Sequence, residues 1–414
     1  MEFRLKADLS APTSFIKDKV FYCLIRVIML YMVSAMTKSL WVKFLPLNHI
    51  LGTTVFILVI TIYFISFNKR DLFIIIPSIA LILSGFFMTY DLSIHLKSSV
   101  YWLITIMFLW KLQNEEIARE LYKEIIKANR FILVVVIIAD ILLCIGMIVP
   151  SGYLENFMGK YFVGFSIAPH SLGAVVCLLL ISILALIESK KSKKLWFLLL
   201  LPGIYAIFNS GARIFLISLL IVIAIVYFNF IESRKHQLII LPFAAIVFTV
   251  FVVGSGMMDK FDFVIGNKFI SSDLIAQLSS GRAEFWLIDI RAYMDYDILS
   301  KLFGKGFDEI YLINLENYGL RIWGHNDIID LLLGTGLCGV TLYMTVIGVN
   351  ILCIFKNTKN RLSAVLLVAY LLIPMLLNGF YPFQTYVYSY VILFLLMRIG
   401  YNNPGSLDKG LLQS

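Results

Sequence analysis

Long apolar runs recur along the whole chain and constrain its fold more than any other feature. A helix needs about 20 mostly apolar residues to cross the hydrocarbon core of a bilayer. Runs that meet or nearly meet this length occur from one end of the sequence to the other. The sequence therefore predicts about twelve spans, at residues 20–36, 44–66, 72–90, 97–112, 131–149, 170–187, 195–208, 213–230, 237–256, 326–355, 362–380 and 384–398.

The composition agrees with an all-α, polytopic membrane protein. Of the 414 residues, 60% are hydrophobic and 15% are charged. A soluble domain is closer to half apolar and a quarter charged. Because the apolar excess is spread over the chain, we predict an integral membrane protein rather than a soluble domain with one anchor.

Positive charges indicate the orientation of the spans. By the positive-inside rule, connections rich in Lys and Arg lie in the cytoplasm. This assignment puts both termini in the cytoplasm, and it explains the net charge of +9 by topology and anionic lipid headgroups, without nucleic acid as a partner. The cytoplasmic connections are then those containing 69–70, 111–130, 190–194, 234–235 and 356–361.

One connection on the opposite side is long enough to contain a folded element. It divides the chain into residues 1–256 with nine predicted spans, the connection 257–325 itself, and residues 326–414 with three spans. Ser279-Ser280-Gly281 indicates the start of an amphipathic helix that continues to about Tyr293. We therefore expect short helices in this connection.

His325 is the leading candidate for a chemical role. It lies in Trp323-Gly324-His325-Asn326-Asp327, directly before a long apolar run. Polar side chains at the water–lipid boundary cost free energy unless something requires them. An imidazole with an ordinary pKa near 6.5 can accept a proton at neutral pH. Asn326 or Asp327 would orient the ring or cap the helix, and the alternative is a histidine that only packs at the helix end.

Two arginines on the same side of the membrane each open a predicted helix. Arg213 follows the small residues 209–212, and Arg282 follows Gly281. A helix N-terminus offers free N–H groups and a positive dipole, and the guanidinium adds a fork of donors suited to phosphate. The alternatives are an Arg213 that reaches lipid headgroups and an Arg282 that pairs with Glu284 or Asp289.

Other polar residues on this side are weaker candidates. His170 also lies at a helix mouth and is a candidate for the same cavity. Arg291, Arg321 and Lys305 are candidates for contacts with an anionic lipid. We expect no metal and no cofactor, because the sequence contains neither an Asp-rich cluster nor a His/Cys ligand set.

Three stretches, in this order, resemble the O-antigen polymerase and O-antigen ligase family of bacterial polysaccharide assembly. They are residues 209–213 at the start of a span, Ser280-Gly281-Arg282 with Trp286 and the Gly-rich run 303–307, and the His-Asn run with its apolar helix at 324–339. Their order and spacing, and the long connection before the His-Asn run, are similar to that family. The first stretch lacks the Ser/Thr-Arg-Thr pattern common there.

The resemblance implies a GT-C-like glycosyltransferase of the bacterial inner membrane with its active site facing the periplasm. The donor would be a glycan on undecaprenyl pyrophosphate, and the transfer would be inverting and independent of metal. Arg213 and Arg282 would hold the leaving pyrophosphate, and His325 would position or deprotonate the acceptor hydroxyl. The candidates for substrate contacts are Asn326, Asp327, His170, Arg291, Arg321 and Lys305.

Several functions remain open at this point. A polymerase transfers the glycan to another lipid-linked repeat unit, whereas a ligase transfers it to lipid A–core. We favour the polymerase because bulky aliphatic residues follow Asn326-Asp327, and its expected partners are the donor, the acceptor, membrane lipids and a chain-length regulator. A flippase or transporter would show internal repeats and charges near mid-membrane. An assembly partner would leave the arginines and His325 unexplained.

Overall fold

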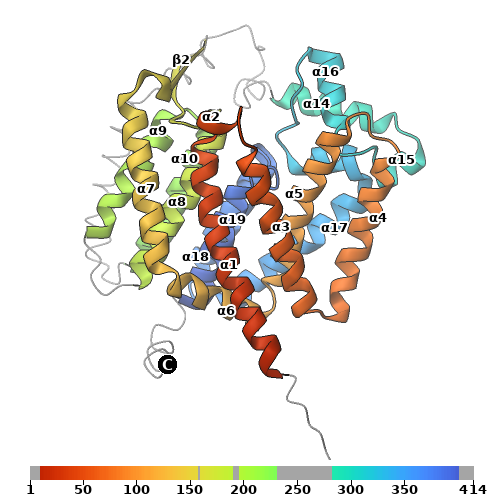
Figure 1. Ribbon diagram of the computed structural model, residues 1–414. Coiled ribbons are helices and arrows are strands. Elements are labelled where there is room, and N and C mark those ends of the chain that lie inside the picture. The colour runs from red at the N-terminus through yellow and green to blue at the C-terminus, as the bar shows by residue number, and fades with distance from the viewer. Residues whose placement is uncertain (1–9, 157–158, 190–194, 231–281, 401–414) are drawn as a thin grey trace, which may run out of the picture.

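The computed structural model describes residues 10–156, 159–189, 195–230 and 282–400. This part of the chain is helical apart from one small hairpin (Figure 1). The longer helices are α1 (Ser10–Met36), α3 (Leu47–Ile65), α4 (Leu72–Phe86), α5 (Leu92–Lys111), α6 (Glu115–Lys127), α7 (Asn129–Ile148), α8 (Pro169–Ser189), α9 (Leu200–Asn209), α10 (Arg213–Phe230), α14 (Arg282–Met294), α16 (Glu309–Tyr318), α17 (Asp327–Asn357), α18 (Arg361–Leu377) and α19 (Gln384–Leu395). The shorter elements are α2 (Lys38–Trp41), η1 (Lys69–Asp71), η2 (Pro150–Gly152), η3 (Leu195–Leu199), α15 (Ile298–Phe303), η4 (Leu396–Gly400) and the antiparallel strands β1 (Tyr153–Asn156) and β2 (Gly159–Phe162).

The predicted spans agree with these helices. Each predicted span outside residues 231–281 coincides with a helix, and the span at 237–256 lies outside the described residues. Within the described ranges, six helices are long and apolar enough to cross a membrane, namely α1, α3, α5, α7, α8 and α17. The all-α prediction is therefore confirmed. The total of twelve spans and the GT-C-like architecture remain predictions.

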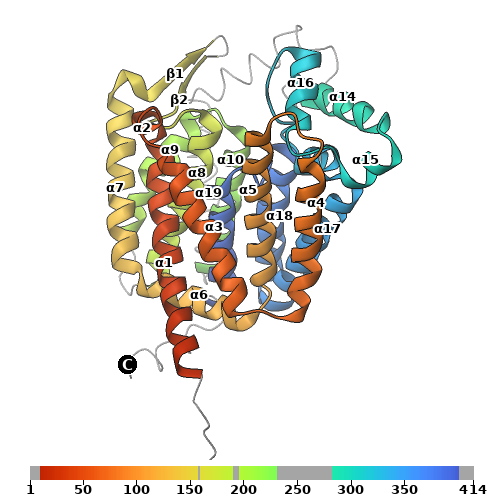
Figure 2. The same cartoon turned by 45° about the vertical axis from the view of Figure 1, so that its right-hand side comes forward.

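The helices form a bundle in which α8 and α19 are largely buried (Figures 1 and 2). In α8, 89% of the most apolar window is buried inside the protein, whereas in α3 the share is 22%. Helices α3, α4 and α7 expose large apolar side chains such as Phe64, Phe73 and Ile148. Soluble monomers seldom expose apolar patches of this extent, so these outer faces are compatible with contact to lipid.

Helix α6 crosses the end of the bundle opposite to α14 (Figure 1). The Asn114 side chain caps it, accepting hydrogen bonds from the N–H groups of Glu116 and Ile117. Its apolar side chains Ile117, Leu121 and Ile125 are buried against α1, α8 and α19. The apolar face of this helix therefore packs on the protein.

The described part of the long connection contains three short helices, as the sequence predicts. Helix α14 occupies Arg282–Met294, where the sequence predicts a helix, and the predicted start at 279–281 lies outside the described residues. The Gly-rich turn after α15 requires positive φ at Gly304 and Gly306. This turn hydrogen-bonds to α17, because Lys305 N–H donates to Leu333 O (2.9 Å) and Gly306 N–H donates to Gly334 O (3.0 Å). It docks where α17 is kinked by the positive φ of Gly336.

A second set of contacts ties this turn to α4 and α5. The Asp308 carboxylate accepts hydrogen bonds from the N–H groups of Tyr90 and Asp91, both at 2.8 Å. The ring of His95 accepts a hydrogen bond from Phe307 N–H (3.1 Å). Residues 303–308 are thus held between α4, α5 and α17, and they position the segment that leads to His325.

Candidate functional site

Arg213, Arg282, His170 and His325 meet at one end of the bundle, and we call them the Arg–His cluster. Three of them lie in the first turns of α10, α14 and α8, and His325 lies just before α17. The rings of His170 and His325 are 6.1 Å apart. Arg282 lies close enough to Arg213 and His325 for their charges to interact. Four segments that are distant in the sequence therefore build a positive site at helix N-termini.

In the turn before Arg213, the backbone lies close to the ring of a tyrosine. Gly211 has a positive φ, and a Cβ there would lie 2.5 Å from the ring of Tyr161. Ala212 N–H donates to the Ser210 hydroxyl (3.3 Å), and both residues are buried. The guanidinium of Arg213 also lies near Tyr161. A larger residue at position 211 would displace Tyr161 and thereby the start of α10.

Arg282 joins α14 to the end of α18. Its guanidinium donates a hydrogen bond to the backbone carbonyl of Leu377. Burial, and secondly the neighbouring Arg213, lower the pKa of Arg282 to about 10. The alternative of an ion pair with Glu284 or Asp289 is not realised, since Arg282 pairs with no carboxylate among the described residues. A partly desolvated guanidinium next to a second cation is suited to bind an anion.

His325 is held in an uncommon backbone conformation with φ of 57°. Its ring lies 4.5 Å from that of Trp323, and the buried Nδ1 has no hydrogen-bond partner in the described part of the chain. Burial first, then Arg282 and His170, lower the pKa of His325 well below its usual value, and the backbone of Asn378 opposes this shift. The imidazole is therefore neutral at physiological pH and able to accept a proton.

The sequence left open whether Asn326 or Asp327 caps α17 or orients the ring of His325. The hydrogen bonds of the two side chains answer this question. Asn326 caps α17, because its side-chain oxygen accepts from Ile328 N–H (2.9 Å) and Ile329 N–H (3.4 Å). Asp327 is fully buried. Its carboxylate accepts hydrogen bonds from Tyr343 Oη (2.7 Å), Phe380 N–H (2.8 Å) and Tyr381 N–H (3.2 Å). The prediction that Asp327 contacts substrate is therefore wrong, because this side chain ties α17 to the α18–α19 connection.

We expect Asp327→Ala to lower the free energy of unfolding by about 3 kcal/mol or more. The substitution leaves three donors buried without an acceptor, and each such group costs about 1–3 kcal/mol. Thermal unfolding of the protein in detergent measures the effect. Asp295→Ala, at an exposed position, is the matched control. Equal melting temperatures for the two variants would contradict the structural role of Asp327.

Three other candidates lie outside the Arg–His cluster. Lys305 lies over the ring of Tyr296 (4.0 Å) and near Glu309 (3.8 Å). Arg291 is exposed on α14. Arg321 forms an ion pair with Asp91 and also lines a cavity. The structure therefore does not bring these three residues to the Arg–His cluster, and their contacts with lipid or substrate remain predictions.

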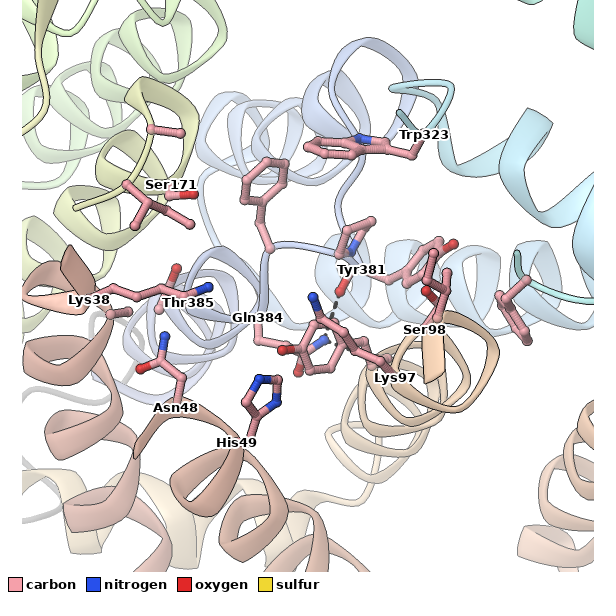
Figure 3. Close-up of a pocket in the computed structure, with 18 of the residues that line it drawn as sticks. Lys38, Asn48, His49, Lys97, Ser98, Ser171, Trp323, Tyr381, Gln384 and Thr385 are labelled. Atoms are coloured by element: carbon pink, nitrogen blue, oxygen red, sulfur yellow. Dashed lines mark hydrogen bonds between the residues drawn. The ribbon is translucent and has the colours of Figure 1, made fainter. Parts of the chain in front are cut away.

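A cavity of about 540 Å³ lies beside the Arg–His cluster (Figure 3). Trp323 and Phe383 line it, and their rings are 6.0 Å apart. Trp323 also packs on His325, and Ser171, next to His170, lines the same cavity. The cavity and the cluster thus share a wall formed by Trp323.

Sequence reasoning missed several residues of this cavity. Asp330 lines it, with Oδ1 accepting from Gly324 N–H (2.9 Å). A carboxylate within the apolar run that follows His325 was a signal for it. Lys38 and Lys97 also line the cavity.

Asp289 lies next to the segment that holds His325. It is completely buried on α14, and within the described ranges neither carboxylate oxygen has a hydrogen-bond partner. A Cβ on Gly324 would lie 3.4 Å from Oδ2 of Asp289. Burial raises the pKa of Asp289 to about 7, so the folded protein favours the protonated carboxyl group.

This raised pKa makes the stability depend on pH. The unfolded chain releases the proton near pH 3.9, whereas the folded protein keeps it up to about pH 7. Between these two pH values, raising the pH lowers the free energy of unfolding. This loss of stability is complete above the pKa of the folded state. We expect the melting temperature to fall more steeply between about pH 5 and about pH 8 for the wild type than for Asp289→Asn. Parallel curves from thermal unfolding would contradict the shifted pKa.

The comparisons with known proteins identify no family. No model of a protein family matches the chain, and a search of curated proteins returns no match. Across the residues that the structure describes, no group of three or more His, Cys, Asp or Glu side chains is arranged to hold a metal ion.

Proposed function

We propose that the protein is a membrane glycosyltransferase that polymerises the lipid-linked repeat units of a bacterial surface polysaccharide. The observation that carries this proposal is the Arg–His cluster, in which two arginines and two histidines from four distant segments converge beside a cavity. The proposed donor is a glycan on undecaprenyl pyrophosphate, as the resemblance to the O-antigen polymerase family implies. The same proposal places the protein in the bacterial inner membrane.

Arg213 and Arg282 are the proposed binding site of the donor pyrophosphate. Two neighbouring guanidinium groups repel each other, and a bound pyrophosphate removes this repulsion. Negative charge grows on the pyrophosphate as the glycosidic bond breaks, and preorganised cations stabilise charge at the place where it develops. The leaving group therefore needs neither a nucleotide nor a metal for its stabilisation.

His325 is the proposed base. The acceptor hydroxyl oxygen forms a bond to the anomeric carbon, while the bond between this carbon and the pyrophosphate oxygen breaks. The hydroxyl proton passes to the imidazole, and the electron pair leaves with undecaprenyl pyrophosphate. Because attack and departure occur on opposite faces of the carbon, the configuration is inverted. A pyrophosphate bound at Arg282 offsets the charge that lowers the pKa of His325, so the base becomes stronger once the donor is bound.

The proposed orientation places the Arg–His cluster in the periplasm. Helix α6 belongs to the connection 111–130, which contains five Lys or Arg residues, and it lies at the opposite end of the bundle (Figures 1 and 2). Connections rich in Lys and Arg are cytoplasmic. This orientation fits a lipid-linked donor, because a nucleotide-sugar donor would be supplied from the cytoplasm.

A gel of surface polysaccharide tests the proposal. Cells that lack the gene should lose the ladder of polymer lengths and retain core that carries a single repeat unit, and the wild-type gene should restore the ladder. If all glycan is lost from the lipid A–core while lipid-linked polymer accumulates, the protein is a ligase rather than a polymerase. An unchanged ladder would contradict glycosyl transfer to a growing polymer.

A further inference from the structure

Two lysines and a histidine meet in the cavity, on elements that do not contribute to the Arg–His cluster. Lys38 comes from α2, His49 from α3 and Lys97 from α5. Figure 3 shows Lys38 and Lys97 extending from opposite sides toward the middle of the cavity, with His49 beside them. Burial, and secondly the charge of Lys97, lower the pKa of Lys38. The ammonium groups of Lys38 and Lys97 are thus close enough for their charges to interact.

The protein supplies no counter-charge for this group. In the described part of the chain, none of the three side chains forms an ion pair or a hydrogen bond, and Lys97 has the ring of Tyr101 at 5.8 Å as a neighbour. Asp330 is the carboxylate among the cavity-lining residues. It is engaged by Gly324 N–H and pairs with none of the three. Like charges that are partly desolvated repel each other strongly, so this arrangement favours a bound anion.

The other residues that line the cavity are of types that bind glycans. Asn48 and Gln384 provide amide groups and Thr385 a hydroxyl, and Tyr101 and Tyr311 provide aromatic rings. Gln384 is held in place by donating to Tyr381 O (2.7 Å) and Tyr101 O (3.0 Å). The volume of about 540 Å³ is in the range of pockets for small ligands. Sugars need this combination of polar groups and flat apolar surfaces.

We propose that Lys38, His49 and Lys97 bind an anionic substituent, a carboxylate or a phosphate, on the acceptor glycan. That the ligand is an acceptor rests on the function proposed above, whereas the anion site rests on the cavity itself. An ammonium group is a point charge that does not select between carboxylate and phosphate by its shape. The site lies across the cavity from Trp323, and the bound acceptor is oriented with its opposite end at the wall shared with His325. The site would make the enzyme selective for acidic repeat units.

A titration that follows individual lysines tests this site without any transfer reaction. The full-length protein is placed in nanodiscs of phosphatidylcholine, its lysines are labelled by reductive ¹³C-methylation, and NMR spectra are recorded with glucuronate, inorganic phosphate or glucose. Lys38→Gln and Lys97→Gln assign the signals. Lys43, an exposed lysine between α2 and α3, is the internal control. We expect saturable shifts of Lys38 and Lys97 with glucuronate or phosphate, no shift with glucose, and no saturable shift of Lys43.

The outcomes separate the sources of the anion. A response to glucuronate supports a carboxylate on the glycan, and a response to phosphate alone supports a phosphorylated glycan. Signals that move when phosphatidylglycerol is added to the nanodiscs, and no longer respond to either soluble anion, would overturn the proposal in favour of a lipid headgroup. No response to any anion would also overturn it. Lys38→Gln should weaken anion binding at the remaining lysine by roughly tenfold.

This test is independent of the proposed function. If the titration fails, the polysaccharide gel still decides whether the protein is a polymerase. If the gel contradicts the polymerase while both lysines bind anions, the anion site remains and its ligand is not an acceptor glycan. Under the polymerase proposal, Lys38→Gln should raise KM for an acidic acceptor and leave kcat unchanged, whereas loss of fold would lower kcat as well.

Discussion

Replacing His325 should abolish polymer formation while the protein remains at its normal level in the membrane. A positioned base contributes about 10²- to 10⁴-fold to the rate. Trp323 and His170 contact the ring from the side. The rate of elongation, measured with purified protein and lipid-linked repeat units, should fall by at least about 100-fold in His325→Ala.

The backbone of His325 requires a matched second variant. Alanine is disfavoured at the positive φ of this residue, and a loss of activity in His325→Ala alone could reflect strain. Asparagine tolerates this conformation well and lacks a group that accepts a proton at neutral pH. We expect His325→Asn to fold with the melting temperature of the wild type and to be as inactive as His325→Ala. Activity in a well-folded His325→Asn would exclude the role as a base.

Arg282→Ala should lower kcat/KM for the donor by about 10²- to 10³-fold, the usual effect of removing one preorganised donor from a developing anion. Arg282→Lys should restore activity only in part, because an ammonium group lacks the forked donors of a guanidinium. The rates are measured with the lipid-linked donor and a saturating acceptor. Lys43→Ala, which removes an exposed cation, should leave kcat/KM unchanged.

A binding measurement distinguishes this role from a structural one. Arg282 also donates to Leu377 O, so its loss could loosen the contact between α14 and α18. Inorganic pyrophosphate should raise the melting temperature of the wild type, because a ligand that binds the folded state stabilises it. The same addition should stabilise Arg282→Ala less than the wild type, because only the site at Lys38, His49 and Lys97 then binds the anion. Equal stabilisation of both proteins would contradict the pyrophosphate site.

Local features of the fold were predictable from the sequence. The apolar runs located the helices outside residues 231–281, and the helix that extends to about Tyr293 and the Gly-rich run at 303–307 were also predicted. These features depend on residue types that are close together in the chain. A run of apolar residues has one favourable conformation in lipid, and glycine is the residue that accepts positive φ without strain.

How the helices pack against one another was harder to predict from the sequence. Periodicity shows that a helix such as α6 has an apolar face, but it does not show whether lipid or protein covers that face. Helices α5 and α17 both line the cavity, although they are more than 200 residues apart in the sequence. Their approach depends on the kink at Gly336 and on the turn that docks there.

Part of the candidate site was predictable from residue types, whereas the rest depends on tertiary contacts. Arg213, Arg282 and His325 stood out because polar groups at the membrane boundary need a cause. The same reasoning misassigned Asp327, since the sequence does not show that Tyr343 and the backbone of Phe380 and Tyr381 are its partners. Lys38 and Lys97 are ordinary residues by type, and their proximity follows from tertiary structure alone.

Reconstitution of the purified protein with a lipid-linked repeat unit tests the central claim most directly. The reaction should contain a metal chelator and no nucleotide. We predict polymers of increasing length, with release of undecaprenyl pyrophosphate in proportion to the glycosidic bonds formed, and neither product with His325→Asn. A wild-type protein that forms no polymer under these conditions, or a His325→Asn variant that forms it at the wild-type rate, would contradict the proposed glycosyl transfer.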